Sequence, residues 1–261
     1  MRALHGAAGR PLGIDCVVPA AGLASRMAGE KLSCDFRGRP LVTHAVANAL
    51  AACRRVIVVA GHDAEAVRAS LAAPILADAI ENTEPGSPAI RNADRLAIVE
   101  NPDYQHGMIT SIARGAIEVE STFFFVAPAD MPFLRPTIFR QIAVTAGIVQ
   151  DAAGRGASGE TPGAREITAS GTSGEVAAWL PAHRGRPCHP VLIRSSLRRA
   201  LSEYVRGAAA KDPAGKLPSM RRFLADYSTM QVPVDDVRAS IDIDTEEEFR
   251  RYARDTGGEE S

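Results

Sequence analysis

The chain has 261 residues, with 30 Lys and Arg against 31 Asp and Glu, which gives a formal net charge of -1. This balance argues against a general affinity for nucleic acid or anionic membranes, and a hydrophobic fraction of 46% is ample for a sizeable core. No stretch reaches the roughly 18 apolar residues that span a bilayer, and residues 1–13 lack the apolar segment of a signal peptide. We therefore expect a cytoplasmic protein with no nucleic-acid or membrane partner.

The cysteines show no metal-ligand spacing such as CxxC, and are expected to be reduced thiols with three of the four in or near the core. They are Cys16, Cys34, Cys53 and Cys188.

Strand-like and helix-like segments alternate along residues 14–256, which predicts an α/β fold with a mostly parallel central sheet covered by helices on both faces. The predicted strands are 14–19, 55–60, 96–100, 122–127, 176–181, 190–194 and 229–234. The predicted helices are 40–53, 63–71, 108–119, 135–146, 195–204, 219–226 and 245–253.

The expected organisation is a single domain over residues 14–255, preceded by an N-terminal extension (1–13) and followed by a short tail (256–261). Residues 150–174 are rich in Gly, Ser, Ala and Thr without apolar periodicity, so they are predicted to be a flexible insertion. Residues 78–94 are predicted to be a surface loop.

A turn of small residues and two cations follows the first predicted strand. Small residues let the backbone approach a triphosphate and point N–H groups at it, and the cations would neutralise phosphate charge during transfer. A tight turn with two surface cations is the alternative. The turn contains Ala20, Ala21, Gly22, Leu23, Ala24, Ser25, Arg26 and Lys31.

A carboxylate, Asp130, follows the strongest predicted strand, 122–127. Ligands bind at the carboxyl ends of strands in open α/β sheets, and Mg²⁺ prefers one or two carboxylates together with phosphate oxygens and water. Asp130 is therefore a candidate Mg²⁺ ligand, with capping of the next helix as the structural alternative.

Two further carboxylates, Asp242 and Asp244, lie near the C-terminus. Alternation puts them on the same side of an extended segment, and Asp244 also precedes a predicted helix that it could cap. Thr245 and Glu248 have the spacing of a capping box.

The chain resembles the MobA-like nucleotidyltransferases, and among them the molybdenum cofactor cytidylyltransferases, over about 200 residues. The turn at 20–31 resembles the family's (L)AAGxSxRMGxxK loop, and 242–249 resembles its DxDTPEDL string. Residues 37–41, 61–67, 101–111 and 184–191 resemble its GxPL, GHDAEAV, NPDYxxGMxxS and RGxxGHPVLF strings.

The resemblance implies a Rossmann-like three-layer α/β/α domain and a Mg²⁺-dependent nucleotidyltransferase. It implies that Arg26 and Lys31 act on the phosphates, that Asp130 and Asp244 bind the metal, and that Asp242 supports them. Gly61 and Ser111 join the small-residue turn as expected nucleotide-binding residues, although Ser111 equally fits a helix-facing role.

The Ala20-Ala21-Gly22 turn, together with the NPDYxxGM string, implies CTP as the nucleotide, with GTP as the alternative. The implied acceptor is a molybdopterin-type phosphate, and the implied recipient of the product is a molybdoenzyme or its chaperone. His189 and Arg221 are the expected acceptor-binding residues, although a lone histidine is as often a structural hydrogen-bonding residue.

Two alternatives remain open at this stage. The segment after His189 departs from the family pattern, which leaves a sugar, alcohol or other pterin phosphate as possible acceptors. A nucleotide- or cofactor-binding protein without transfer activity is the second alternative.

Overall fold

The computed structural model describes residues 11–22, 31–71, 95–149, 165–167, 175–212, 215 and 217–254. Within these ranges, no helix is long and apolar enough to cross a bilayer.

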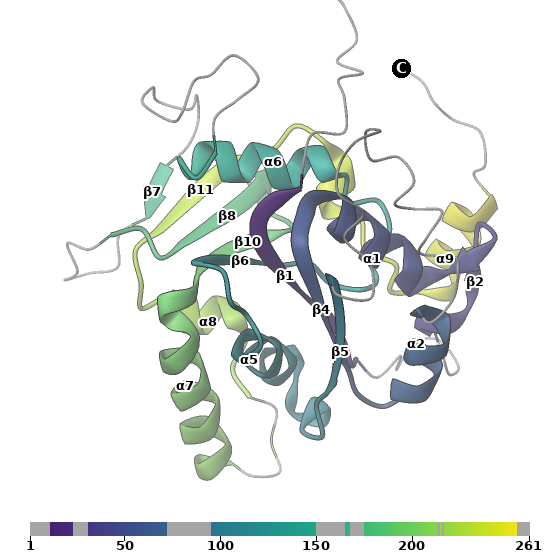
Figure 1. The fold of residues 1–261 in the computed structure, drawn as a ribbon, viewed down its shortest axis with the longest axis horizontal. Coiled ribbons are helices and arrows are strands. Elements are labelled where there is room, and N and C mark those ends of the chain that lie inside the picture. Colours follow the sequence, from purple (N-terminus) through teal and green to yellow (C-terminus); the bar gives the residue numbers. More distant parts are fainter. Residues whose placement is uncertain are drawn as a thin grey trace, which may run out of the picture.

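Nine of the described strands form one sheet, in the order β5-β4-β1-β6-β10-β8-β11-β7, with β9 paired to β8 (Figure 1). Strands β5, β4, β1, β6, β8 and β11 share one direction, whereas β10, β7 and β9 run the opposite way. The sheet is therefore mixed and mostly parallel, as expected. The strands are β1 (Leu12–Ala20), β4 (Cys53–Ala60), β5 (Leu96–Glu100), β6 (Phe123–Val126), β7 (Arg165–Ile167), β8 (Ala178–His183), β9 (Arg186–Pro187), β10 (Val191–Arg194) and β11 (Thr229–Pro233).

Helices cover both faces of the sheet and give the three-layer, Rossmann-like architecture (Figure 1). One core cluster joins α1, α2 and α6 to the sheet, and a second joins α5, α7 and α8 to the other face. The helices are α1 (Leu41–Ala52), α2 (Ala64–Leu71), α5 (Met108–Ile117), α6 (Pro136–Thr145), α7 (Arg198–Lys211), α8 (Met220–Leu224) and α9 (Glu246–Arg254).

Strand β1 lies between β4 and β6, and alternate side chains contribute to the two clusters, Cys16 and Val18 to one and Val17 to the other. A strand buried on both faces reads as a continuous apolar run, which is why it was recognisable in the sequence. Its buried exception, Asp15, is paired with Arg54 at 3.0 Å and accepts the backbone N–H of Glu120 at 2.8 Å.

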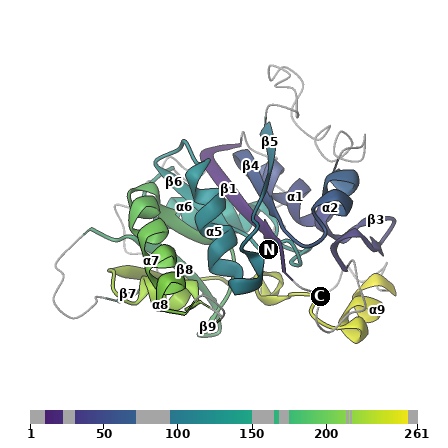
Figure 2. The same cartoon turned by 90° about the horizontal axis from the view of Figure 1, so that it is seen from below.

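A third, smaller cluster lies at one end of the molecule, where α9 packs against a hairpin formed by β2 (Asp35–Phe36) and β3 (Arg39–Pro40). Figure 2 shows α9 beside β3 and far from α7. The buried members are Phe36, Leu41 and Ile243, and Phe133, Phe249 and Tyr252 pack against them.

Every predicted strand and helix has a counterpart in the structure, and two differences have clear causes. Helix α7 continues to Lys211 instead of ending at 204, because the following Ala-rich residues favour helix. Residues 165–167, inside the predicted flexible insertion, form β7 and pair antiparallel with β11. The rest of that stretch, and the predicted loop at 78–94, lie outside the described residues.

The cysteine prediction is confirmed, since Cys16, Cys53 and Cys188 are buried and Cys34 is exposed. Burial raises the pKa of the Cys188 thiol to about 11, so that this thiol is protonated near neutral pH.

Candidate active site

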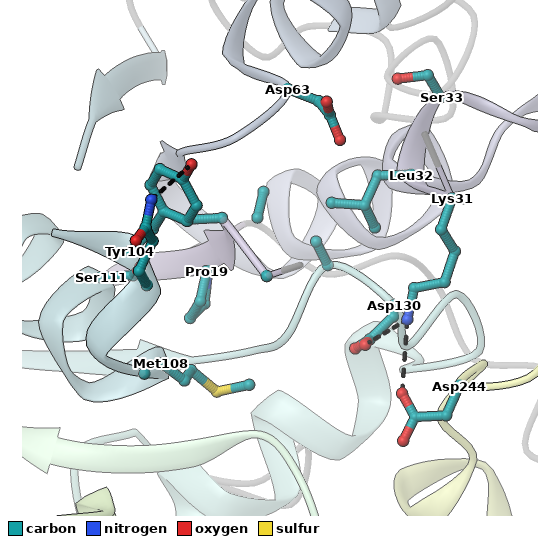
Figure 3. A pocket seen from close by; sticks show the side chains of 16 residues that line it. Pro19, Lys31, Leu32, Ser33, Asp63, Tyr104, Met108, Ser111, Asp130 and Asp244 are labelled. Atoms are coloured by element: carbon teal, nitrogen blue, oxygen red, sulfur yellow. Dashed lines mark hydrogen bonds and ion pairs between the residues drawn. The ribbon is translucent and has the colours of Figure 1, made fainter. Parts of the chain in front are cut away.

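A cavity of about 300 Å³ opens where the segments following β1, β4, β5 and β6 meet (Figure 3). These are the carboxyl ends of four parallel strands, the place where open α/β sheets bind ligands. The cavity is lined by Pro19, Ala20, Ala21, Gly22, Lys31, Leu32, Ser33, Asp63, Tyr104, Gln105, Gly107, Met108, Ser111, Ala129, Asp130 and Asp244.

At one end of the cavity, Lys31 joins the two candidate metal carboxylates (Figure 3). Its Nζ lies 3.0 Å from Oδ2 of Asp130 and 3.5 Å from Oδ1 of Asp244, and it donates to the carbonyl oxygen of Ile243 at 2.7 Å. The two aspartates, far apart in sequence, therefore meet at one cation. This convergence was predicted.

The chain holds this arrangement by backbone contact as well as by side chains. The N–H of Ile243 donates to the carbonyl oxygen of Asp130 at 3.0 Å. The Ile243 side chain is fully buried with Phe36 and Leu41, while Phe133 and Phe249 pack against the same cluster. Asp130, which accepts this hydrogen bond, and Asp244, the residue after Ile243, are thus anchored to a common apolar cluster.

The helix-capping alternatives do not describe either aspartate. Helix α6 begins at Pro136, and its N-cap residue is Arg135, so Asp130 lies outside the cap. The capping box at α9 is formed by Thr245, whose Oγ1 accepts the N–H of Glu248 at 3.2 Å, while Glu248 accepts the N–H of Thr245 at 2.8 Å. The carboxylate of Asp244 is therefore free to face the cavity.

Gly61, which directly follows β4, packs closely between the small-residue turn and the chain that follows β5. A Cβ atom added at Gly61 would lie 2.6 Å from Cβ of Ala21 and 2.9 Å from Cβ of Tyr104. Such distances are too short for a real Cβ, so only glycine allows this approach. Gly61, expected to bind nucleotide, does not itself line the cavity; it packs directly behind residues that do.

Ser111, on the first turns of α5, lines the cavity and is held by a buried amide. Nδ2 of Asn101 donates to Oγ of Ser111 at 3.0 Å and to Oγ1 of Thr110 at 2.8 Å, and Oδ1 accepts the N–H of Asp103 at 3.0 Å. One buried side chain thus fixes the loop after β5 against the start of α5.

Asp63, Met108 and Tyr104 are among the lining residues that were not identified as site residues from the sequence. Asp63, which directly precedes α2, points its carboxylate into the cavity (Figure 3). Met108 leaves 52% of its surface exposed, and Tyr104 contacts Nδ1 of His62 through its hydroxyl at 3.2 Å. Asp63 follows β4 much as Asp130 follows β6, so the strand-end rule was a usable signal for it.

Several expected residues do not line the cavity. Arg221 is exposed on α8, and Asp242 is exposed and is not among the lining residues. His189 is half-buried, and desolvation lowers the pKa of its imidazole, against the opposing effects of the Val126 carbonyl and the Asp130 charge. Residues 23–26, which include Arg26, lie outside the described residues.

The pKa of Asp242 is raised, first by partial desolvation and then by the negative charges of Asp244 and Asp130. The acidic residues therefore repel one another, and a cation relieves that repulsion.

The oxygens around Nζ of Lys31 are suitable ligands for a hard divalent cation: two carboxylates and a backbone carbonyl. The ammonium group already shows that a cation fits among them. Among the described residues, no group of three or more His, Cys, Asp or Glu side chains converges on a metal position, so a cation here would rely on two side chains and on oxygens from other sources.

A family model described as the MobA-like NTP transferase domain matches residues 16–229. The match covers most of the chain, and its limits include the small-residue turn and Asp130. The chain belongs to the MobA-like NTP transferase domain family.

The molybdenum cofactor cytidylyltransferase of Escherichia coli (strain K12) is 25% identical over 237 residues, which cover 90% of this chain and 93% of that protein. A nucleotidyl transferase from Methanothermobacter has a similar fold, with a TM-score of 0.59, 17% identity, and coverage of 91% of this chain and 94% of its own. Molybdopterin-guanine dinucleotide biosynthesis protein A from Archaeoglobus fulgidus gives a TM-score of 0.56 at 14% identity, covering 92% and 97%.

Proposed function

We propose that this protein transfers CMP from CTP to the phosphate of a molybdopterin-type cofactor, with Mg²⁺ as the metal and pyrophosphate as the second product. The observation that carries this proposal is the meeting of Asp130 and Asp244 at Lys31, at one end of a cavity that begins beside the Ala20–Gly22 turn. The family membership and the cytidylyltransferase relative support the reaction class.

In the proposed reaction, an oxygen of the acceptor phosphate attacks the α-phosphorus of CTP. A new P–O bond forms, the bond between the α-phosphorus and its bridging oxygen breaks, and pyrophosphate leaves with that oxygen. Mg²⁺ held by Asp130 and Asp244 would screen the negative charge that builds on the phosphate oxygens during transfer.

The residues of this chain position the reactants and neutralise charge. Backbone N–H groups of Ala21 and Gly22 face the triphosphate, and Lys31 and Arg26 contribute positive charge to it. Asp130 and Asp244 would hold the metal.

We assign Ser111 and Met108 to the nucleoside end, because they line the cavity across from Lys31 (Figure 3). His189, Arg221 and Asp242 remain candidates for acceptor binding and metal support that contribute from outside the cavity. A molybdoenzyme or its chaperone is the proposed recipient of the dinucleotide product.

The proposal is tested by measuring pyrophosphate release from each nucleoside triphosphate with Mg²⁺ and candidate acceptors, molybdopterin first. We expect CTP to support turnover, and Asp130→Ala to lower kcat by about 10³-fold or more with an unchanged fold, as when a main electrostatic contact to the transition state is lost. Asp226→Asn, an exposed carboxylate ion-paired within α8 and its C-cap region, serves as the matched control and keeps wild-type activity.

Two outcomes would redirect the proposal. Turnover with GTP and not CTP, or with a sugar phosphate and not molybdopterin, would replace the substrates while keeping the reaction. Binding of CTP without pyrophosphate release from any acceptor would favour the non-catalytic binding protein.

A further inference from the structure

We propose that Lys31 is an exchangeable counter-ion: its ammonium occupies the divalent-cation position between Asp130 and Asp244 when no metal is bound, and moves to the triphosphate when metal and nucleotide bind. The inference rests on the proposed function of this site. It adds that metal and nucleotide binding are coupled through a single lysine.

The contacts of Nζ account for all three donors of an ammonium group. They are Oδ2 of Asp130 at 3.0 Å, the carbonyl oxygen of Ile243 at 2.7 Å, and Oδ1 of Asp244 at 3.5 Å. The Lys31 side chain is only 11% exposed, and it sits at the end of the cavity rather than on the surface. A compact charge so enclosed by hard oxygens resembles a bound ion more than a surface ion pair.

A divalent cation and this ammonium cannot occupy the same oxygens. Both need the lone pairs of Asp130 and Asp244, and two cations at that spacing repel one another. Metal binding therefore requires the Lys31 ammonium to give up both carboxylates. The ammonium then either leaves this position or keeps only its hydrogen bond to the Ile243 carbonyl oxygen.

A bound triphosphate gives the Lys31 ammonium a second binding position when it leaves the carboxylates. Its stem is a flexible four-carbon chain, so the ammonium can be redirected without movement of the backbone. Ala21 and Gly22, where we place the triphosphate, line the same cavity as Lys31. A triphosphate there offers the lysine new anionic oxygens in place of the carboxylates that the metal takes.

This exchange predicts positive coupling between metal and nucleotide. If the ammonium occupies the donor set in about nine of ten molecules, it weakens apparent metal binding about tenfold in the absence of nucleotide. A bound triphosphate takes the lysine away from the carboxylates and so restores the full metal affinity. Thermodynamic linkage then requires the metal to strengthen nucleotide binding by the same factor.

The test is a titration of wild type, Lys31→Met and Arg199→Met with Mn²⁺. The EPR signal of the free ion measures how much Mn²⁺ remains unbound. Arg199 lies on α7 with a 91% exposed side chain, so its variant removes one positive charge away from the cavity. Without nucleotide, we expect Lys31→Met to bind Mn²⁺ about tenfold more tightly than wild type, and Arg199→Met to match wild type. With CTP, the advantage of Lys31→Met should shrink or reverse.

The double variant Lys31→Met with Asp130→Asn tests whether the Mn²⁺ ion is bound at Asp130. We expect this variant to lose the tighter Mn²⁺ binding of Lys31→Met. If Lys31→Met binds Mn²⁺ no more tightly than wild type, or if the double variant retains the gain, the exchange is wrong. Lys31→Gln repeats the comparison with a neutral polar chain should the methionine variant unfold, as judged by circular dichroism.

A second readout follows the lysine itself. In protein labelled with ¹⁵N-lysine, the signal of the Lys31 ammonium, identified by its absence in Lys31→Met, should shift when Mg²⁺ is added without nucleotide. A signal that stays fixed while the metal binds would overturn the exchange but not the proposed transferase. Failure of wild type to bind Mn²⁺ even with CTP, together with no pyrophosphate release, would instead overturn the proposed function.

Discussion

Nε of Arg37 donates to the carbonyl oxygen of Tyr252 at 2.8 Å, joining the β2–β3 hairpin to the last turn of α9. The same guanidinium lies 5.1 Å from the ring centre of Phe133 and 5.5 Å from that of Phe36. Phe133 follows Asp130 by three residues, and α9 begins two residues after Asp244. Arg37 therefore ties together the two segments that carry the site carboxylates.

We expect Arg37→Ala to lower the free energy of unfolding by about 1–2 kcal/mol, from the lost charged hydrogen bond and ring contacts. It should also raise the Mg²⁺ concentration needed for half-maximal activity, because α9 and Asp244 are held less firmly. Urea unfolding and an activity titration with Mg²⁺ measure the two effects.

Arg184 provides the matched control. It also has a positive φ (48° against 57° for Arg37) and precedes a positive-φ glycine, while no side-chain contact of Arg184 is observed within the described residues. Arg184→Ala should change stability by less than about 0.5 kcal/mol. Equal effects of the two substitutions would mean that the turn conformation, and not the link to α9, is responsible.

Glycines in two helices should respond oppositely to alanine. A Cβ at Gly115 in α5 would lie 2.5 Å from Cγ1 of Val17 and 2.8 Å from Cγ2 of Val59, so Gly115→Ala should destabilise by about 1–3 kcal/mol through overpacking. A Cβ at Gly207 in α7 would meet nothing within 4 Å, so Gly207→Ala should stabilise by about 0.4–1 kcal/mol. Thermal or urea unfolding measures the change in stability of each variant. A stabilising Gly115→Ala would contradict the close packing of α5 on β1 and β4.

Gly61→Ala should act on nucleotide binding. The added methyl group would collide with Ala21 and Tyr104 and displace the wall of the cavity at its nucleotide end. We expect KM for CTP to rise about tenfold or more, with a smaller change in kcat, since about 1.4 kcal/mol of lost binding is one factor of ten. Gly13→Ala, with open space around its Cβ, is the control. An unchanged KM would show that the turn adjusts without cost.

Stability should fall in mild acid because of His44. Burial lowers the pKa of His44 below its ordinary 6.5, and the charges of Arg39 and Arg37 lower it further, against the opposing hydrogen bond to the Phe36 carbonyl. Below pH 6.5 the unfolded chain binds a proton that the folded chain does not, so stability present above that pH is lost as the pH falls toward the folded-state pKa.

Urea unfolding at pH 7.5, 6.5 and 5.5 measures this loss, and His44→Gln should make the dependence less steep. His189, whose pKa is lowered mainly by burial, contributes in the same direction, so part of the slope should remain. A slope that is the same in wild type and His44→Gln would rule out His44 as a source.

The sequence by itself determined the order and type of the main strands and helices, though not the short strands β2, β3, β7 and β9. It also identified the residues at the Lys31 end of the site. Continuous apolar runs such as Val56–Ala60 are recognisable without tertiary information, because a strand buried on both faces must be apolar throughout. Asp130 could be selected as a metal ligand because it follows a strong strand near a phosphate-binding turn, whereas Asp244 was paired with it only through the resemblance of residues 242–249 to the DxDTPEDL string.

Only the tertiary structure decided which side chains meet. Lys31 could be assigned to phosphate from its spacing, but its position between two carboxylates depends on Ile243 entering the cluster with Phe36 and Leu41. Gly61, by contrast, packs behind the turn without lining the cavity, and Asp63 both directly precedes α2 and lines the cavity. Such outcomes depend on distances between segments far apart in the chain, which residue spacing does not encode.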